Sequence, residues 1–324
     1  MRVLLACIDA VNESDLNLLR DIYEDNYHGE LRAIGIGHTV SSALAIITGR
    51  VPYFHGKPVG DWFIDNELLN YELFGDNVVG RSGLGEVWFH YPLLYPPPRR
   101  RNTVIVSGPP HVNLGYYTQP PWLEEELMQM GYIPDVPPDP NFTLSIDFLV
   151  NMERKRGEAV RRVLSEFDWG IGVTWWTGLD RLHHDREQYV RAEDTPYNRS
   201  LIITAIEREI LRTIDELHPD YTIIFGDHGW SDEVKYHAPR TIYMIYPMKG
   251  RGGVASVVDL MPTAYKLLGL PNPFGKESID LGRPYLVPRP LMDRRSDYIS
   301  IGEKSEDSLA IIREAIKRYG DVAV

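Results

Sequence analysis

Short apolar runs alternate with longer amphipathic segments along most of the chain. Residues 3–8 are apolar without interruption, which predicts a strand that is buried on both faces of a sheet. Runs of similar length predict further strands at residues 32–36, 86–90, 103–106, 168–174, 221–225 and 241–246. Segments with apolar residues on one face predict helices at residues 15–27, 40–48, 142–167, 195–217, 257–268 and 306–319.

This alternation predicts an α/β fold, with a mostly parallel central sheet and helices on both of its faces. We expect residues 1–270 to form one domain, and residues 271–324 to form a C-terminal extension that packs on the core or at a subunit interface. Residues 60–140 are rich in Pro, Tyr and Trp and are weakly periodic, so we expect an inserted cap region there. Ligands of such sheets bind beyond the carboxyl ends of the strands.

The composition limits the compartment and the partners. The chain has 324 residues and a formal net charge of −12, which argues against a nucleic-acid polymer or an anionic membrane as the partner. Cys7 is the single cysteine, so no intrachain disulfide requires an oxidising compartment. The first apolar run ends at Asp9, too early for a signal peptide, and no run approaches the ~20 apolar residues of a membrane span. We therefore expect a cytoplasmic protein with no membrane partner. The composition is compatible with a homo-oligomer.

Two polar side chains follow the first predicted strands. Asp9 ends the first apolar run, where an unpaired carboxylate is costly to bury. It could instead cap the next helix, although Asn12 and Asp15 are nearer to that helix. Thr39 precedes the predicted helix 40–48, where it is either an N-cap or a hydroxyl whose pKa a bound cation would lower.

Acidic and imidazole groups follow a later strand. Asp180 and His184 are four residues apart, so on a helix they share one face and can hold one cation. An Asp and a His on an ordinary surface helix would look the same. His183 replaces His184 as the candidate ligand if the helix begins one residue later.

A second group of candidates follows the strand predicted at 221–225. Asp227 and His228 would point in opposite directions in a regular strand, but Gly229 allows a turn at which both side chains converge. The alternative is a turn Asp beside a half-buried His. His237, nine residues further on, is either an exposed loop residue or the third protein ligand of the cation held by Asp180.

Four motifs in this order carry a family resemblance. Thr39 stands nine residues before Thr48-Gly49, and a Pro and a His-Gly step follow. The later motifs are Asp180-x-x-x-His184, then Asp227-His228-Gly229, and then the segment 258–270. Together they resemble the alkaline phosphatase superfamily, and within it the type I phosphodiesterase/nucleotide pyrophosphatase branch.

The resemblance implies an alkaline phosphatase-like fold and two divalent metal ions, usually zinc, with manganese as the alternative. It implies that one metal is held by Asp180, His184 and His237, and the other by Asp9, Thr39, Asp227 and His228. It further implies that Thr39 attacks the phosphorus of a small phosphoester, and that water then hydrolyses the phospho-enzyme.

The chain also departs from the family pattern. The nucleotide pyrophosphatase branch often places an Asn five residues after the His of the His-Gly step, and Gly60 stands there in this chain. The sequence therefore leaves open whether the substrate is a nucleotide, and whether it is a diester or a monoester. Two alternatives to a hydrolase also stay open, namely a metal-binding member with little or no activity, and a phosphotransferase to an acceptor other than water.

Overall fold

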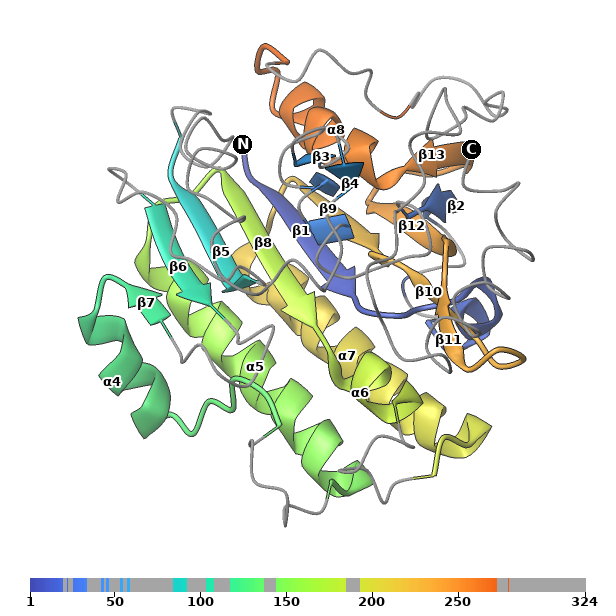
Figure 1. Ribbon diagram of the computed structural model, residues 1–324. Coiled ribbons are helices and arrows are strands. Elements are labelled where there is room, and N and C mark those ends of the chain that lie inside the picture. The colour runs from blue at the N-terminus through green and yellow to red at the C-terminus, as the bar shows by residue number, and fades with distance from the viewer. Residues whose placement is uncertain are drawn as a thin grey trace.

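The computed structural model describes residues 1–19, 22, 26–33, 42–43, 45–46, 53–54, 57–58, 84–91, 103–107, 117–136, 144–184, 193–272 and 279. Its centre is a nine-stranded sheet in the order β13-β2-β12-β9-β1-β8-β5-β6-β7 (Figure 1). The bounds of these strands are β1 Val3–Ile8, β2 Tyr27–Arg32, β5 Glu86–Tyr91, β6 Thr103–Ser107, β7 Tyr117–Gln119, β8 Ile171–Trp176, β9 Tyr221–Phe225, β12 Arg240–Tyr246 and β13 Arg251–Ser256.

The smaller elements are two hairpins and the helices. The hairpins are β3 (Tyr53–Phe54) with β4 (Lys57–Pro58), and β10 (Gly229–Ser231) with β11 (Tyr236–Ala238). The helical elements are η1 Glu13–Leu18, α4 Trp122–Gln129, α5 Ile146–Glu166, α6 Gly178–His183, α7 Pro196–Leu217, η3 Val257–Asp259 and α8 Leu260–Leu267. None of the helices in the described part of the chain combines the length and the apolar composition that a bilayer crossing requires.

The sheet is mostly parallel, as predicted. The pairings of β1 with β8 and β9, of β5 with β6 and β8, and of β13 with β2 are parallel. Only β12 and β7 run against the other strands of the sheet that the structure describes. The carboxyl ends of β9, β1 and β8, which are neighbours in the order, therefore lie at one edge.

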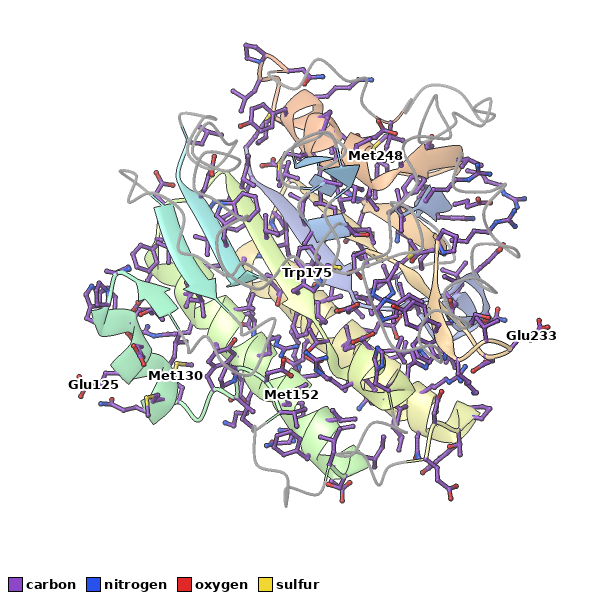
Figure 2. All side chains as sticks on the ribbon, viewed as in Figure 1. Glu125, Met130, Met152, Trp175, Glu233 and Met248 are labelled. Carbon is purple, nitrogen blue, oxygen red and sulfur yellow. The ribbon has the colours of Figure 1, made fainter. Side chains whose placement is uncertain are left out.

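Helices cover both faces, because alternate side chains of each buried strand enter different cores. On β1, Leu5 and Cys7 pack in the core that α8 covers, whereas Ala6 and Ile8 pack in the core that α5 and α7 cover. Figure 2 marks one side chain of each core, Trp175 on β8 and Met152 on α5. The uninterrupted apolar run of β1 follows from this double burial.

The main error of the sequence prediction lies at β2. The helix predicted over 15–27 extends too far, because Tyr27 already belongs to β2. The strand predicted over 32–36 starts too late, because β2 ends at Arg32. Only Tyr27 and Leu31 of this strand are buried. Its other positions are partly exposed and mostly polar, so the strand lacks the apolar run that marks a central strand in a sequence. The pairing of β2 with β12 and β13, which are distant in sequence, decides its structure.

The segment 60–140 contributes to the central sheet. Strands β5 and β6 match their predictions, and β7 and α4 extend the same edge. The elements β1, β8, β9, β12, α5, α7 and α8 follow their predicted ranges to within four residues, and α5 and α7 are capped by Ser145 and Thr195. The sequence pattern predicts no element at β13 or at the β3–β4 and β10–β11 hairpins. Residues 60–83, 92–102, 108–116, 137–140 and 306–319 lie outside the described residues, so the inserted cap and the last helix stay predictions. Ile279, in the C-terminal extension, is buried and donates its backbone N–H to Thr263 Oγ1 at 2.8 Å.

A buried ion pair fixes the start of α6. Glu153 on α5 accepts a hydrogen bond from the backbone N–H of Gly178, the first residue of α6. Arg156 donates to Glu153 Oε2 at 2.9 Å and to Thr177 Oγ1 at 3.1 Å, and neither side chain of the ion pair is exposed to solvent. The short helix α6 is therefore held to the long helix α5 by charged hydrogen bonds.

Replacing Arg156 tests this anchor. Arg156→Met leaves the Glu153 carboxylate buried without its counter-charge, so we expect the free energy of unfolding to fall by about 3–5 kcal/mol. Lys155→Met is the matched control, because Lys155 forms an i,i+3 pair with Glu158 on the same helix at a partly exposed site. That pair should contribute no more than about 1 kcal/mol. Urea unfolding measures both, and equal losses in the two variants would contradict the anchor.

Candidate metal centre

Four acidic and imidazole side chains follow three neighbouring strands at the carboxyl edge of the sheet. Asp9 directly follows β1, and its backbone N–H bonds to the Trp176 carbonyl at the end of β8. Asp180 lies on α6, which follows β8. Asp227 and His228 follow β9 within three residues. The parallel pairing of β1 with β8 and β9 brings these groups together from three parts of the sequence.

The β10–β11 hairpin brings His237 back to this edge. His237 pairs with Trp230 across the hairpin, and Glu233 lies in the connection between the two strands (Figure 2). The imidazole of His237 stacks on that of His228, with ring centroids 3.9 Å apart and planes at 17°. The nine-residue spacing in the sequence is therefore enough for His237 to reach the cluster.

One set of ligand atoms comes from Asp180, His184 and His237. The Nε2 atoms of the two histidines are 3.0 Å apart. Asp180 Oδ1 lies 3.4 Å from His184 Nε2 and 3.6 Å from His237 Nε2. Ligands at the usual 2.0–2.1 Å from a tetrahedral zinc ion are separated by about 3.3–3.4 Å. These three atoms therefore form a triangle of the size that one cation requires.

A second set comes from Asp9, Asp227 and His228. His228 Nε2 lies 3.0 Å from Asp9 Oδ1 and 3.7 Å from Asp227 Oδ2. His228 Nδ1 lies 3.0 Å from the Gly229 carbonyl oxygen, which can accept only if Nδ1 carries a proton. In the neutral ring, Nε2 then directs its lone pair toward the carboxylates, as a metal ligand does.

Burial makes this cluster costly without a cation. The exposed fractions of Asp9, Asp180 and Asp227 are 3%, 4% and 0%. Apart from the neighbouring imidazole nitrogens, Asp9 Oδ1, Asp180 Oδ1 and both carboxylate oxygens of Asp227 have no hydrogen-bond partner among the described residues. Buried carboxylates with free oxygens are normally paired with a counter-charge or coordinate a metal. Asp9, Asp227 and His228 place ligand atoms within 4.8 Å of one another, and so do Asp180, His228 and His237. These donors fit divalent cations.

Solved structures with the same architecture are known. Murine ectonucleotide pyrophosphatase/phosphodiesterase 5 matches with a TM-score of 0.52 at 11% identity, over 86% of this chain and 98% of that chain. The human protein of the same name matches with a TM-score of 0.52 at 12% identity, over 86% and 97%. The phosphonate monoester hydrolase of Agrobacterium radiobacter matches with a TM-score of 0.50 at 14% identity, over 83% and 74%. The sequence matches no protein-family model and, in a search of curated proteins, no relative.

The chain has an alkaline phosphatase-like fold. The fold class that the four motifs imply is thereby confirmed. At 11–14% identity the similarity concerns the fold, so the ligand roles of the individual residues remain predictions.

The alkaline phosphatase-like fold places its acidic residues so close together that their pKa values shift. Burial raises the pKa of Asp227 well above its usual value, and the Asp9 carboxylate raises it further. Burial would lower the pKa of His228, but the carboxylates of Asp227 and Asp9 outweigh it and raise that pKa to about 10. A proton on His228 thus offsets part of the negative charge that a cation would otherwise neutralise.

Two groups of the first set, His237 and Asp180, are in the ionisation states that a ligand needs. Burial, together with the nearby positive charge of His228, lowers the pKa of His237 to about 3, so this imidazole is neutral. Burial opposes ionisation of Asp180, but the imidazoles of His184 and His237 outweigh it and hold the pKa of Asp180 well below its usual value.

The structure distinguishes the two adjacent histidines. His184 faces Asp180 and His237, whereas His183 Nδ1 lies 3.1 Å from Asp194 Oδ2. Thr39 lies outside the described residues, so its place among the ligands stays a prediction. The sequence analysis missed Asp194, and no motif marks it. Its position just before the Thr195 N-cap of α7 is the only signal that the sequence offers.

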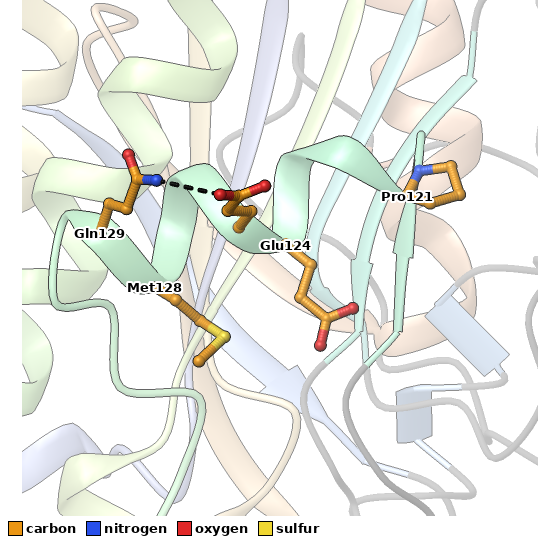
Figure 3. A pocket seen from close by; sticks show the side chains of 5 residues that line it. Pro121, Glu124, Met128 and Gln129 are labelled. Atoms are coloured by element: carbon orange, nitrogen blue, oxygen red, sulfur yellow. Dashed lines mark hydrogen bonds between the residues drawn. The ribbon is translucent and has the colours of Figure 1, made fainter.

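A hollow on the outer face of α4 is a separate feature. Figure 3 shows its lining, in which Gln129 Nε2 donates to Glu125 Oε1 at 3.3 Å. Helix α4 packs beside β7, which is an edge strand of the sheet, whereas β1 is its central strand. None of the residues that line the hollow belongs to the metal-ligand cluster, so the two features are separate.

Replacing Asp227 separates stability from metal binding. In the metal-free protein the Asp227→Asn variant should unfold at a higher temperature than wild type, because the raised pKa of Asp227 means that its ionised form opposes folding at pH 7. Zinc should raise the unfolding temperature of wild type, because it binds only the folded chain, and should raise that of the variant less.

Thermal unfolding with and without zinc measures both effects. Asp215→Asn is the control, because Asp215 is an exposed carboxylate on α7 and its loss should change neither temperature. An Asp227→Asn variant that zinc stabilises as much as wild type would contradict the assignment of Asp227 as a ligand.

Proposed function

We propose that this protein is a metal-dependent hydrolase of small phosphoesters that uses two divalent cations, zinc or manganese, and Thr39 as the nucleophile. The observation that carries the proposal is the pair of ligand triangles at the ends of β1, β8 and β9. Two cations placed side by side can stabilise both the attacking and the leaving oxygen of a phosphoryl transfer.

The solved structures of the same fold support this reaction class. Their names describe a pyrophosphatase/phosphodiesterase and a phosphonate monoester hydrolase, both of which cleave esters of phosphorus. The murine protein was also solved as an inactive threonine-to-alanine variant in complex with AMP. A threonine is therefore important for activity in one protein of this fold, which supports Thr39 as the nucleophile in this chain.

Each residue then has a definite task. Asp180, His184 and His237 would hold one cation, and Asp9, Asp227 and His228 would hold the other together with Thr39. Bound cations would supply Lewis acidity that neutralises the charge of the phosphoryl oxygens and favours the ionised hydroxyl.

The reaction proceeds in two displacements. In the first, Thr39 gives up its hydroxyl proton and its Oγ forms a bond to phosphorus. The bond from phosphorus to the leaving oxygen breaks, and the departing alcohol takes up one proton in exchange. In the second, water attacks the phosphorus and the bond to Thr39 Oγ breaks, and one proton of that water restores the threonine hydroxyl. The net reaction consumes one water molecule.

The test is hydrolysis of p-nitrophenyl phosphate and bis-p-nitrophenyl phosphate with added zinc or manganese. Thr39→Ala should lower kcat at least about 10³-fold, the scale on which loss of a nucleophile acts. Thr39→Ser is the matched control, because it keeps a hydroxyl at the same position and should retain measurable turnover.

Two results would count against the proposal. Full metal-dependent activity in Thr39→Ala would exclude Thr39 as the nucleophile. Binding of two cations without cleavage of either ester, or of a wider panel that includes nucleotides and phosphonates, would instead favour a protein that binds metals without turnover.

A further inference from the structure

Two aromatic rings outside the ligand sets lie flat against each other beside the metal-ligand cluster. The rings of His183 and Trp230 have centroids 4.9 Å apart and planes at 4°. His183 is 3% exposed and Trp230 is 6% exposed, so the stack is part of the interior. We call this pair the His183–Trp230 stack.

The Trp230 indole also contacts both imidazoles of the first ligand set. Its ring lies 5.1 Å from that of His184 at 71°, which is an edge-to-face contact. It lies 5.9 Å from that of His237 at 58°. Trp230 thus contacts His183 together with two candidate ligands that come from different elements, His184 after α6 and His237 on β11.

Charged residues hold His183 in the stack. His183 Nδ1 lies 3.1 Å from Asp194 Oδ2, and Asp194 Oδ2 also accepts from Arg199 Nη2 at 2.7 Å. Arg199 Nη1 donates to Asp232 Oδ2 at 2.9 Å, in the connection between β10 and β11. The network therefore connects α6, the start of α7 and the hairpin that carries His237.

The backbone of Trp230 is held by the loop that follows β1. Its N–H donates to Asn12 Oδ1 at 2.7 Å. The N–H of Asn12 in turn donates to Asp15 Oδ2 at 2.8 Å. The loop that begins at Asp9 therefore fixes Trp230, while His183 fixes the plane of its ring.

Simple filling of space does not account for these residue types. Among the described residues, His183 Nε2 and Trp230 Nε1 are buried without a hydrogen-bond partner. A buried polar group in that state costs free energy that apolar side chains of similar volume would avoid. Flat, rigid rings at these positions therefore indicate a requirement for shape and orientation.

We infer that His183 and Trp230 are positioning residues, which set the orientation of His184 and His237 for the cation that these share with Asp180. The inference rests on the proposed function, since it concerns one of its two cations. A metal ligand needs its ring held to within about 10–20°. Groups around a metal's ligands typically contribute 10–100-fold to its affinity. Here the contacts of the Trp230 ring limit the rotation of both imidazoles.

The experiment is titration of the metal-free protein with Co²⁺, followed by its visible absorption and by calorimetry. Trp230→Leu and His183→Leu should weaken binding at one of the two sites about tenfold or more, with a changed cobalt spectrum, and leave the other site as in wild type. His183→Phe keeps a flat ring without the bond to Asp194, so it should bind cobalt more tightly than His183→Leu.

Trp122→Leu is the matched control. It removes an indole at the start of α4 that is 53% exposed and stacked on Phe167, near the β7 edge of the sheet. This variant should bind both cobalt ions as wild type does. If Trp230→Leu does not fold, the two His183 variants carry the test, because Asp194 keeps its pair with Arg199 in both of them.

The outcomes separate the inference from the proposed function. Wild-type affinity at both sites in Trp230→Leu and His183→Leu, with only a lower unfolding temperature, would mean that the stack is ordinary packing and would overturn the inference. A wild-type protein that binds two cobalt ions but cleaves no phosphoester would refute the proposed hydrolase and leave the positioning role intact. A wild-type protein that binds no cobalt would refute both.

Discussion

The structure depends on one electrostatic constraint at the carboxyl edge of its sheet. Asp9, Asp180 and Asp227 are brought together by three parallel strands and are nearly inaccessible to water. Such a concentration of buried negative charge is unfavourable by itself. The imidazoles of His184, His228 and His237 lie among the carboxylates at the distances that metal ligands keep from one another. A pair of divalent cations, as we propose, would satisfy this charge and this geometry together.

The remainder of the described structure can be understood as the support of that cluster. The buried Glu153–Arg156 pair holds α6, which carries Asp180, against the long helix α5. The hairpin that carries His237 is tied to α7 by the pairing of Arg199 with Asp232. Each ligand set therefore combines groups from separate elements, and the sheet together with these buried charges determines their relative positions. A displacement of any one element would change contacts of only 3.0–3.7 Å between candidate ligand atoms.

Sequence patterns anticipated the elements whose burial is uniform and missed those that depend on distant partners. The continuous apolar run of β1 and the capped helix α7 are visible in the sequence because local composition reflects their burial directly. Strand β2 cannot be recognised in the sequence in this way, because half of its side chains are polar. Its pairing with β12 and β13 decides its structure.

The same distinction applies to the candidate site. Motif spacing proposed Asp180, Asp227 and His228, but the choice between His183 and His184 required the position of Asp194, which no spacing reveals. The distance from His228 to His237 had a structural meaning only once the β10–β11 hairpin was known. Gly60 and Thr39 lie outside the described residues, so the phosphate-binding groups remain predictions from sequence.

Anomalous X-ray diffraction from crystals of the zinc-loaded protein tests the central claim most directly. The account predicts two zinc peaks about 4 Å apart, one among Asp180, His184 and His237 and the other among Asp9, Asp227 and His228. A single peak held by Asp180, His228 and His237, or crystals in which these side chains bind no zinc, would contradict it.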